Sequence, residues 1–342
     1  MNIRTFRSDL LLFITALIWG FAFVAQRVGM ESVGPFTFTG IRFCLGCLVL
    51  APVILLRKGR GDEETQSKGQ DSKYPSDSSS LTPTFFPTKG DLAPEGRGER
   101  ARQDETTRLK GTSSLKRGGM LRTGIIAGTL LFAGASLQQV GLVYTTAGNA
   151  GFITGLYVVL VPIIGIALGQ HTSTYTWIGA GCAAAGMYFL SVTQGLTISF
   201  GDLLELLGAF FWAVHVLVIG LYAPRLDAFR LAFIQYASCA ILSLLVAALY
   251  ETVTLPSLEQ ALLPILYGGV ISVGIAYTLQ IVGQKEAPSS HAAILMSLES
   301  VFAALGGWLM LNEQLSARQL AGCMLMLTGM LLSQLSRTRN PS

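Results

Sequence analysis

One stretch of 79 residues, from Thr123 to Gly201, contains no Asp, Glu, Lys or Arg. A soluble domain has about 25% charged residues, so a chain with such a stretch is hard to accommodate in a soluble fold. A helix of about 20 mostly apolar residues crosses the hydrocarbon core of a bilayer. Clusters of Gly, Asn and Thr divide the stretch and predict three membrane spans, at 124–143, 150–168 and 175–193.

The charges that the chain does have are concentrated in one segment. Of its 342 residues only 13% are charged, yet residues 57–122 hold 14 of the 24 Lys and Arg and 10 of the 20 Asp and Glu. The rest of the chain has 10 basic and 10 acidic residues, a balance that offers no basic surface for nucleic acid. The sequence therefore predicts a body embedded in a lipid bilayer that carries one long polar segment.

The gaps between charges predict further spans outside the 79-residue stretch. Two of them precede the polar segment and five follow the stretch, at 10–26, 36–56, 206–222, 231–250, 260–284, 287–311 and 319–336. The predicted fold class is an all-α integral membrane protein with ten transmembrane helices.

The chain also contains an internal repeat. "SDLLLFITALIWGFAF" at Ser8 resembles "GDLLELLGAFFWAVHV" at Gly201, at an offset of 193 residues. Farther along, the best offset is 141, where "AGC" at Ala180 meets "AGC" at Ala321. The offsets differ by 52 residues, so the first copy has a surplus of about that length, and the polar segment accounts for it.

Five spans in each copy would insert the second copy upside down. Two inverted five-helix repeats are typical of secondary transporters, whose binding site lies near the midplane between the copies. The predicted organisation is helices one and two at 1–56, the polar loop at 57–122, helices three to five at 123–193 and the second repeat at 202–336.

Basic residues near the span ends predict the orientation. With the N-terminus inside, thirteen Lys and Arg fall on the inner side, and two, Arg27 and Arg318, fall on the outer side. This asymmetry predicts a multi-pass protein of the cytoplasmic (inner) membrane with both termini in the cytoplasm. The 57–122 loop would then be cytoplasmic, and its low hydrophobicity favours disorder. A regulatory or partner-binding role for it is left open.

Two stretches resemble a known family. "LIWGFAFVAQRVG" at Leu17 is similar to the first-helix signature of EamA-type transporters of the drug/metabolite transporter superfamily, and "ILMSLESVFAALGGWLMLNEQLSARQLAGCMLMLTGMLLS" at Ile294 is similar to their last two helices. Where the family often has Pro after the Glu of the ninth helix, this chain has Ser300. The resemblance implies two five-helix repeats and export or exchange of a small molecule without ATP hydrolysis.

Glu299 is the most informative polar residue, because it lies about halfway along the 287–311 span. An isolated charge at the bilayer centre costs roughly 2.5 to 3.5 kcal/mol, so the carboxyl should face a cavity or a partner, or be protonated. Two interpretations stay open, binding of substrate or a proton at the midplane and a hydrogen bond to a neighbouring helix. If transport is coupled to protons, Glu299 is the mid-membrane carboxylate that we expect to carry them.

Arg42 lies six residues after Phe36, about 9 Å into its helix. It either extends back to the outer interface or pairs with a substrate carboxylate or a buried acid.

Other polar and aromatic side chains inside the spans are candidates for a substrate pathway. Tyr277 and Gln280 form a polar stripe, while Trp19 and Trp212 are equivalent in the repeat and also suit packing between the copies. The full candidate set is Glu299, Trp19, Gln138, Gln139, Tyr157, Trp212, His215, Tyr277, Gln280 and Arg42.

No cofactor, metal or catalytic motif is predicted. Cys44 and Cys47 have C-x-x-C spacing, but they lie in an apolar span without a second metal-binding pair. The leading hypothesis is a secondary transporter that moves small metabolites or drugs by alternating access, and the family resemblance implies export as the direction. The alternatives are a polytopic enzyme acting on a lipid-linked substrate and a non-transporting scaffold; oligomeric state is not predicted.

Overall fold

The computed structural model of the protein describes residues 3–71, 96–144, 147–191, 200–311 and 316–339. These residues form helices and turns, and no strand occurs among them. The chain divides into two units, one made of Met1–Ala51 with Arg122–Ser342 and the other of Pro52–Leu121. The fold class is therefore an all-helical membrane protein, as predicted.

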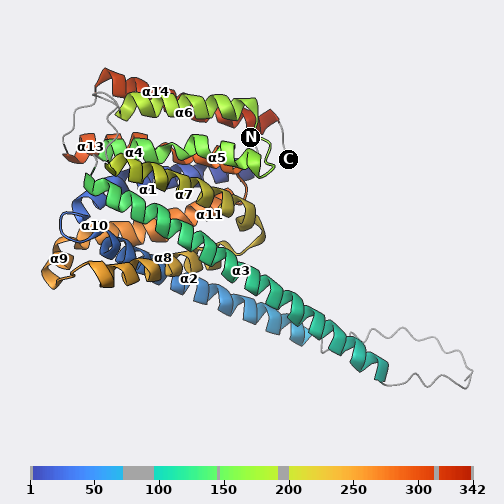
Figure 1. The fold of residues 1–342 in the computed structure, drawn as a ribbon. Helices are drawn as coiled ribbons and strands as arrows, with labels where there is room; N and C mark the ends of the chain where they lie inside the picture. The colour runs from blue at the N-terminus through green and yellow to red at the C-terminus, as the bar shows by residue number, and fades with distance from the viewer. Residues whose placement is uncertain (1–2, 72–95, 145–146, 192–199, 312–315, 340–342) are drawn as a thin grey trace, which may run out of the picture. The chain divides into compact units, whose positions relative to one another are not determined.

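The first half of the chain, up to residue 191, forms six helices (Figure 1). They are α1 (Ile3–Gly29), α2 (Pro35–Asp71), α3 (Gly96–Tyr144), α4 (Ala147–Gly155), α5 (Tyr157–Ala167) and α6 (Thr174–Ser191).

The second half begins at residue 200 and is divided into more pieces. They are α7 (Phe200–Tyr222), the 3₁₀ turn η1 (Ala223–Arg225), α8 (Ala228–Tyr250), α9 (Leu255–Gln260), α10 (Leu262–Leu266), the π-helix η2 (Tyr267–Tyr277), α11 (Thr278–Gln284), α12 (Ser289–Met296), α13 (Glu299–Leu311) and α14 (Ala317–Arg339).

Helix is present in each of the ten ranges where a span is expected. Within the described part of the chain, seven segments are long and apolar enough to cross a membrane: Ile3–Gly29, Pro35–Arg57, Gly118–Tyr144, Phe200–Arg225, Ala228–Tyr250, Leu262–Gln284 and Ser289–Met310. Ile153–Ala167 and Ala317–Ser333 are shorter apolar helices. The count of ten crossings stays a prediction.

The polar segment falls largely in the second unit. Helix α2 continues to Asp71 and α3 begins at Gly96, so both ends of the predicted 57–122 loop are helical. Residues 72–95 lie outside the described residues. The expectation of a disordered cytoplasmic loop stays a prediction.

Two spans that the hydropathy pattern predicts as continuous are interrupted. Leu156 separates α4 from α5, and Ser297 and Leu298 separate α12 from α13. At both breaks the backbone tightens to i→i+3 hydrogen bonds, from Leu156 to Ile153 (3.1 Å) and from Leu298 to Leu295 (3.3 Å). Leu156 and Ser297 are 141 residues apart, which is the offset of the sequence repeat.

The 260–284 span is also not one regular helix. Its central eleven residues form the π-helix η2. A π-helical turn is rare and is found most often at functional sites. Glycines let η2 approach α2, because a Cβ at Gly269 would lie 2.5 Å from Cβ of Leu45 and 3.0 Å from the carbonyl oxygen of Arg42.

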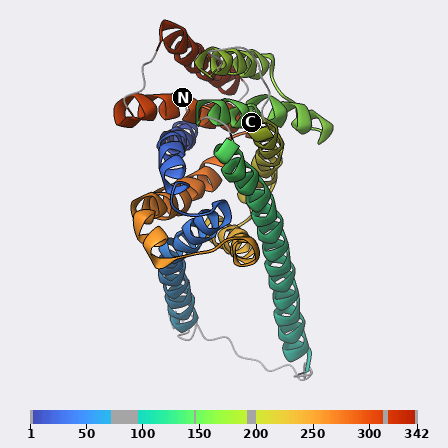
Figure 2. The same cartoon turned by 60° about the vertical axis from the view of Figure 1, so that its left-hand side comes forward.

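Helices α6 and α14 lie side by side in both views (Figures 1 and 2). Their contact is made by glycine. A Cβ at Gly179 would lie 2.7 Å from the carbonyl oxygen of Gly329, and a Cβ at Gly186 would lie 2.6 Å from that of Gly322. Because Gly179 pairs with the later glycine of α14 and Gly186 with the earlier one, the two helices run antiparallel. Small residues that allow backbones to approach are the typical contact between helices in lipid.

This contact predicts opposite effects for two neighbouring Gly→Ala changes in α6. Gly179→Ala should lower the free energy of unfolding by about 1 to 3 kcal/mol, since its Cβ would push the backbones apart. Gly181→Ala is the matched control, because nothing lies within 4 Å of a Cβ there; it should be neutral or stabilise by up to about 1 kcal/mol through helix propensity. Thermal unfolding of both variants in detergent micelles tests this, and equal midpoints would contradict it.

Candidate substrate cavity

A cavity lies among the helices of the first unit, with room of about 40 Å³ for the centres of water molecules. A single water needs roughly 10 to 15 Å³ by this measure, so the space holds about three. Its walls come from ten helical segments of both halves of the chain. They are Trp19, Ala22, Phe23 and Gln26 of α1, Arg42, Gln138, Thr154, Tyr157, Trp212 and Val216 from α2 to α7, and Ser272, Tyr277, Gln280, Met296 and Glu299 from η2 to α13.

Eight of the ten residues predicted for a substrate pathway line this cavity. They are Trp19, Arg42, Gln138, Tyr157, Trp212, Tyr277, Gln280 and Glu299. Gln139 and His215 are fully buried but outside the lining. The structure thus brings most of the set together, while the role of each residue stays a prediction.

Glu299 begins α13, immediately after the helix break, and Tyr157 begins α5, immediately after the other break. The Tyr157 hydroxyl donates a hydrogen bond of 3.1 Å to Oε1 of Glu299. Both side chains are buried, at 3% and 4% exposure. Glu299 therefore lines a cavity and also hydrogen-bonds to a neighbouring helix, and its binding of substrate or a proton stays a prediction. A carboxylate in the first turn also suits the positive end of the helix dipole.

The break next to Glu299 is supported from α4. Ser300, which stands where the family often has Pro, donates a hydrogen bond of 3.0 Å to the carbonyl oxygen of Gly151. The interruption of the ninth span therefore occurs without proline.

Three aromatic side chains meet at one wall. Trp19 lies 4.5 Å from Tyr277 between ring centroids, and Trp212 stacks on Tyr277 at 6.1 Å. Trp19 comes from the first half of the chain and Tyr277 from the second, so their contact joins the two halves, while packing between repeat copies stays a prediction. Both tryptophans also line the cavity.

Arg42 does not extend to the outer interface, which corrects that expectation. Its side chain is 2% exposed and lines the cavity. The guanidinium carbon lies 5.6 Å and 5.3 Å from the ring centres of Phe38 and Phe43 on the same helix. These rings give the cation a favourable place inside the bundle that a hydropathy pattern does not reveal.

The glutamines and His215 form partly satisfied networks. Gln280 donates to Gln284 (3.0 Å), which donates to the carbonyl oxygen of Val216 on α7 (3.0 Å). His215 hydrogen-bonds Gln235 of α8 at 3.1 Å. Neither amide atom of Gln139 has a hydrogen-bond partner among the described residues.

Sequence reasoning missed several polar residues of this region. Gln26, Thr154 and Ser272 line the cavity, but short or isolated polar side chains in apolar spans gave no distinguishing pattern. Glu205 directly precedes the predicted 206–222 span, yet α7 begins five residues earlier and the side chain of Glu205 is fully buried. Its Oε2 accepts a hydrogen bond of 2.9 Å from Thr154. Glu299 is thus not the one carboxyl group inside the bundle.

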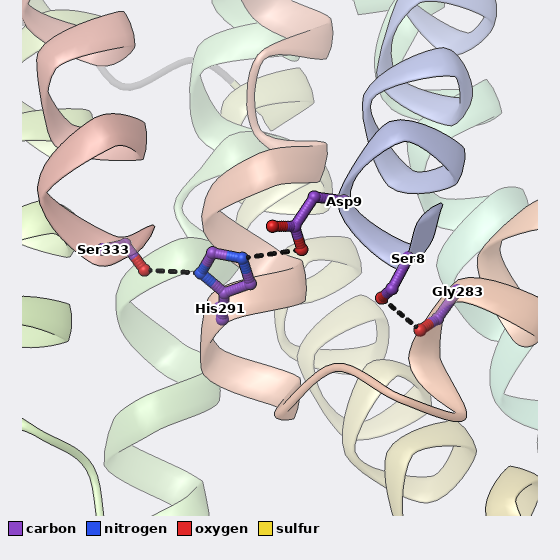
Figure 3. Close-up of polar contacts among 5 residues, drawn as sticks. All are labelled: Ser8, Asp9, Gly283, His291 and Ser333. Carbon is purple, nitrogen blue, oxygen red and sulfur yellow. Dashed lines mark hydrogen bonds and ion pairs between the residues drawn. The ribbon is translucent and has the colours of Figure 1, made fainter. Parts of the chain in front are cut away.

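A second buried polar cluster lies away from the cavity lining, at the start of α1 (Figure 3). His291 of α12 bonds Asp9 of α1 through Nε2 at 3.1 Å and Ser333 of α14 through Nδ1 at 2.8 Å. Ser8 donates to the carbonyl oxygen of Gly283 at 2.8 Å. The cluster therefore joins the first helix of the chain to three segments of its second half.

Nothing in the described residues forms a group of three or more His, Cys, Asp or Glu suited to a metal ion. Cys44 and Cys47 carry free thiols.

Together, an all-helical fold with several apolar spans and a polar cavity enclosed by helices defines a multi-pass integral membrane protein. The model of the EamA-like transporter family matches residues 6–69 and 199–335, more than half of the chain. The chain belongs to this family and is a membrane transporter.

Relatives with similar sequences are also named as transporters. An "Uncharacterized transporter" of Archaeoglobus fulgidus is 29% identical, over 98% of this chain and 88% of that protein. The "Uncharacterized transporter YoaV" of Bacillus subtilis is 20% identical, over 94% and 95%. A solved structure described only as "Crystal structure of protein" has the same fold, with a TM-score of 0.67 and 18% identity over 98% of this chain and 99% of that one.

The buried cluster at the start of α1 predicts a stability effect. His291→Ala removes hydrogen bonds to the buried Asp9 and Ser333, and should lower the free energy of unfolding by roughly 2 kcal/mol or more. His171→Ala is the control, because His171 is exposed. Thermal unfolding in detergent micelles measures both. If the two variants unfold at the same temperature, the cluster does not hold these helices together.

Proposed function

We propose that the protein is a ten-helix secondary transporter that exports a small metabolite or drug across the cytoplasmic membrane. Transport would proceed by alternating access between two inverted five-helix copies, with the substrate bound in the cavity. The observation that carries this proposal is the cavity itself, because its polar and aromatic walls are drawn from both copies. Polar groups inside a membrane bundle typically mark a substrate or ion path.

The boundaries of the helices support the repeat. Pro35 and Ala228, where α2 and α8 begin, are 193 residues apart, and so are Gly29 and Tyr222, where α1 and α7 end. The antiparallel contact of α6 and α14 supports inversion, because these helices are the last of each copy.

The two helix breaks support a conformational change of the helices that surround the cavity. They occur at equivalent places of the two copies, and interrupted helices at equivalent places typically border the binding site of a transporter. The cavity holds only about three waters, so a metabolite requires the walls to separate. Mid-helix i→i+3 turns suit hinges, and Tyr157 and Glu299 are the first helical residues after them.

Glu299 would bind a proton or a polar group of the substrate during the cycle. Its hydrogen bond to Tyr157 crosses between the two copies, so it differs between open and closed states if the copies separate. Its side chain is buried among the polar and aromatic side chains that line the cavity. A carboxyl group in such a place changes its interactions strongly when it gains or loses a proton.

The first experiment compares Glu299→Gln with the wild type. The metabolites released by cells that lack the protein, and by cells that overproduce it, identify the cargo. Flux of that cargo is then measured in vesicles, with and without a pH gradient. Glu299→Gln should lower flux at least tenfold while the protein stays folded and inserted, because the amide cannot exchange a proton.

Glu259→Gln is the matched control, since Glu259 is exposed on α9, and it should transport normally. Unchanged flux in Glu299→Gln would refute the role of this carboxyl. An unchanged metabolite profile between the two cell types would refute transport of a released metabolite altogether.

Deletion of residues 62–112 separates a transporter from a scaffold. No residue that lines the cavity falls in this range, so the deletion should keep at least half of the wild-type flux. A scaffold that recruits partners through the loop would lose its effect on cells. Vesicle flux of the deletion protein is the measurement, and its loss would favour a functional role of the loop.

A further inference from the structure

Arg42 is a buried cation without an acidic partner. No carboxylate among the described residues lies within ion-pair distance of its guanidinium, and Nε has no hydrogen-bond partner there. Glu299 lines the same cavity but is not paired with it. Breaking a buried ion pair, which leaves one charge alone, costs about 3 to 5 kcal/mol, so a chain that keeps a lone buried Arg usually has a use for it.

The contacts of Arg42 pack its aliphatic stem and the face of its guanidinium, and they leave the guanidinium N–H donors for a ligand. The stem passes beside η2, where a Cβ at Gly268 would lie 3.5 Å from Cδ of Arg42. Phe38 and Phe43 lie beside the guanidinium. A cation–π contact is worth about 0.5 to 2 kcal/mol, less than the hydration that the cation loses, and it uses none of the N–H donors.

We infer that Arg42 is the anion-binding residue of the cavity and that the substrate carries one carboxylate on a small apolar or aromatic body. The inference rests on the proposed function. A guanidinium presents paired N–H donors that match the two oxygens of a carboxylate.

The rest of the cavity selects among anions. Arg42 is the one Lys or Arg among the lining residues, and Glu299 stands in the same space. A phosphate ester carries two negative charges, and the single positive charge of Arg42 would neutralise only one of them. An ionised Glu299 would repel it as well. The wall of Trp19, Tyr277 and Trp212 suits a planar or apolar body by stacking.

Charge balance links the two charged groups. With a carboxylate on Arg42, an ionised Glu299 would leave a net negative charge in a low-dielectric site. Carboxylate binding should therefore favour the protonated form of Glu299.

The test is direct binding to the purified full-length protein in lipid nanodiscs. Trp19 and Trp212 line the cavity, so intrinsic tryptophan fluorescence reports occupancy. Benzoate and benzamide are compared because they have the same shape and differ in charge. Benzylamine and phenyl phosphate test the opposite charge and the double charge.

Wild-type protein should bind benzoate at least tenfold more tightly than benzamide, benzylamine or phenyl phosphate. Arg42→Gln should weaken benzoate at least tenfold and leave benzamide unchanged, Arg42→Lys should be intermediate, and Arg230→Gln, an exposed control on α8, should match the wild type. Equal binding of benzoate and benzamide, preference for the amine or the phosphate, or no benzoate binding would each overturn the inference.

A second variant separates binding from folding. Arg42→Met keeps an unbranched apolar stem and removes the lone charge, so its thermal midpoint should equal or exceed that of the wild type while its preference for benzoate disappears. A lower midpoint would make Arg42 a structural residue and overturn the inference. Failure of these binding tests leaves the metabolite comparison unaffected, so it is distinguishable from failure of the proposed function.

Discussion

The structure depends on the fact that lipid offers no hydrogen bonds. Every backbone N–H and C=O inside the hydrocarbon core must be satisfied within the protein, which admits helices and excludes open strands. The same constraint directs polar side chains toward the interior of the bundle. Thr15 illustrates it, because its hydroxyl, fully buried in α1, donates to the carbonyl oxygen of Leu11 (2.9 Å) and lies 3.2 Å from that of Ala276 in η2.

Within this constraint, the close helix contacts and the cavity are built from side chains of opposite size. Where α6 meets α14, glycines bring two backbones together without space for a Cβ. Around the cavity, large aromatic rings and glutamines keep the helices apart. The contact between α1 and α13 shows both in one place: a Cβ at Gly20 would lie 2.7 Å from the carbonyl oxygen of Glu299, whereas the preceding residue in α1, Trp19, lines the cavity. The position of the Glu299 carboxyl is therefore determined by backbone packing.

Hydropathy and charge spacing predicted the helical membrane fold and most of the cavity wall, because both follow from what lipid tolerates. Glu299 and Tyr277 were found for that reason: a polar group in an apolar span must face inward. The helix breaks at Leu156 and at Ser297 were not predicted: Gly155 beside the first is one of many glycines in the apolar spans, and the second has no adjacent Gly or Pro. The π-helix of η2, which packs closely against α2 through Gly269, was not predicted either. Glu205 was missed because counting charges cannot tell a helix end from a helix that continues past it.

The sequence repeat explains why these unpredicted features occur together. The two breaks fall at equivalent places of the sequence repeat, and residues that follow both of them line one cavity. Tyr157 and Glu299 follow equivalent breaks and meet through a hydrogen bond of 3.1 Å, while Trp19 and Trp212, also equivalent, meet at Tyr277. At the repeat offset of 141 residues Tyr157 is equivalent to Leu298 and Glu299 to Val158, so neither residue of the bonded pair is repeated in the other copy. The proposed binding cavity is therefore chemically asymmetric, with Arg42 from the first copy and Glu299 from the second, and under the proposed function a ligand with one charged end would bind in a single orientation.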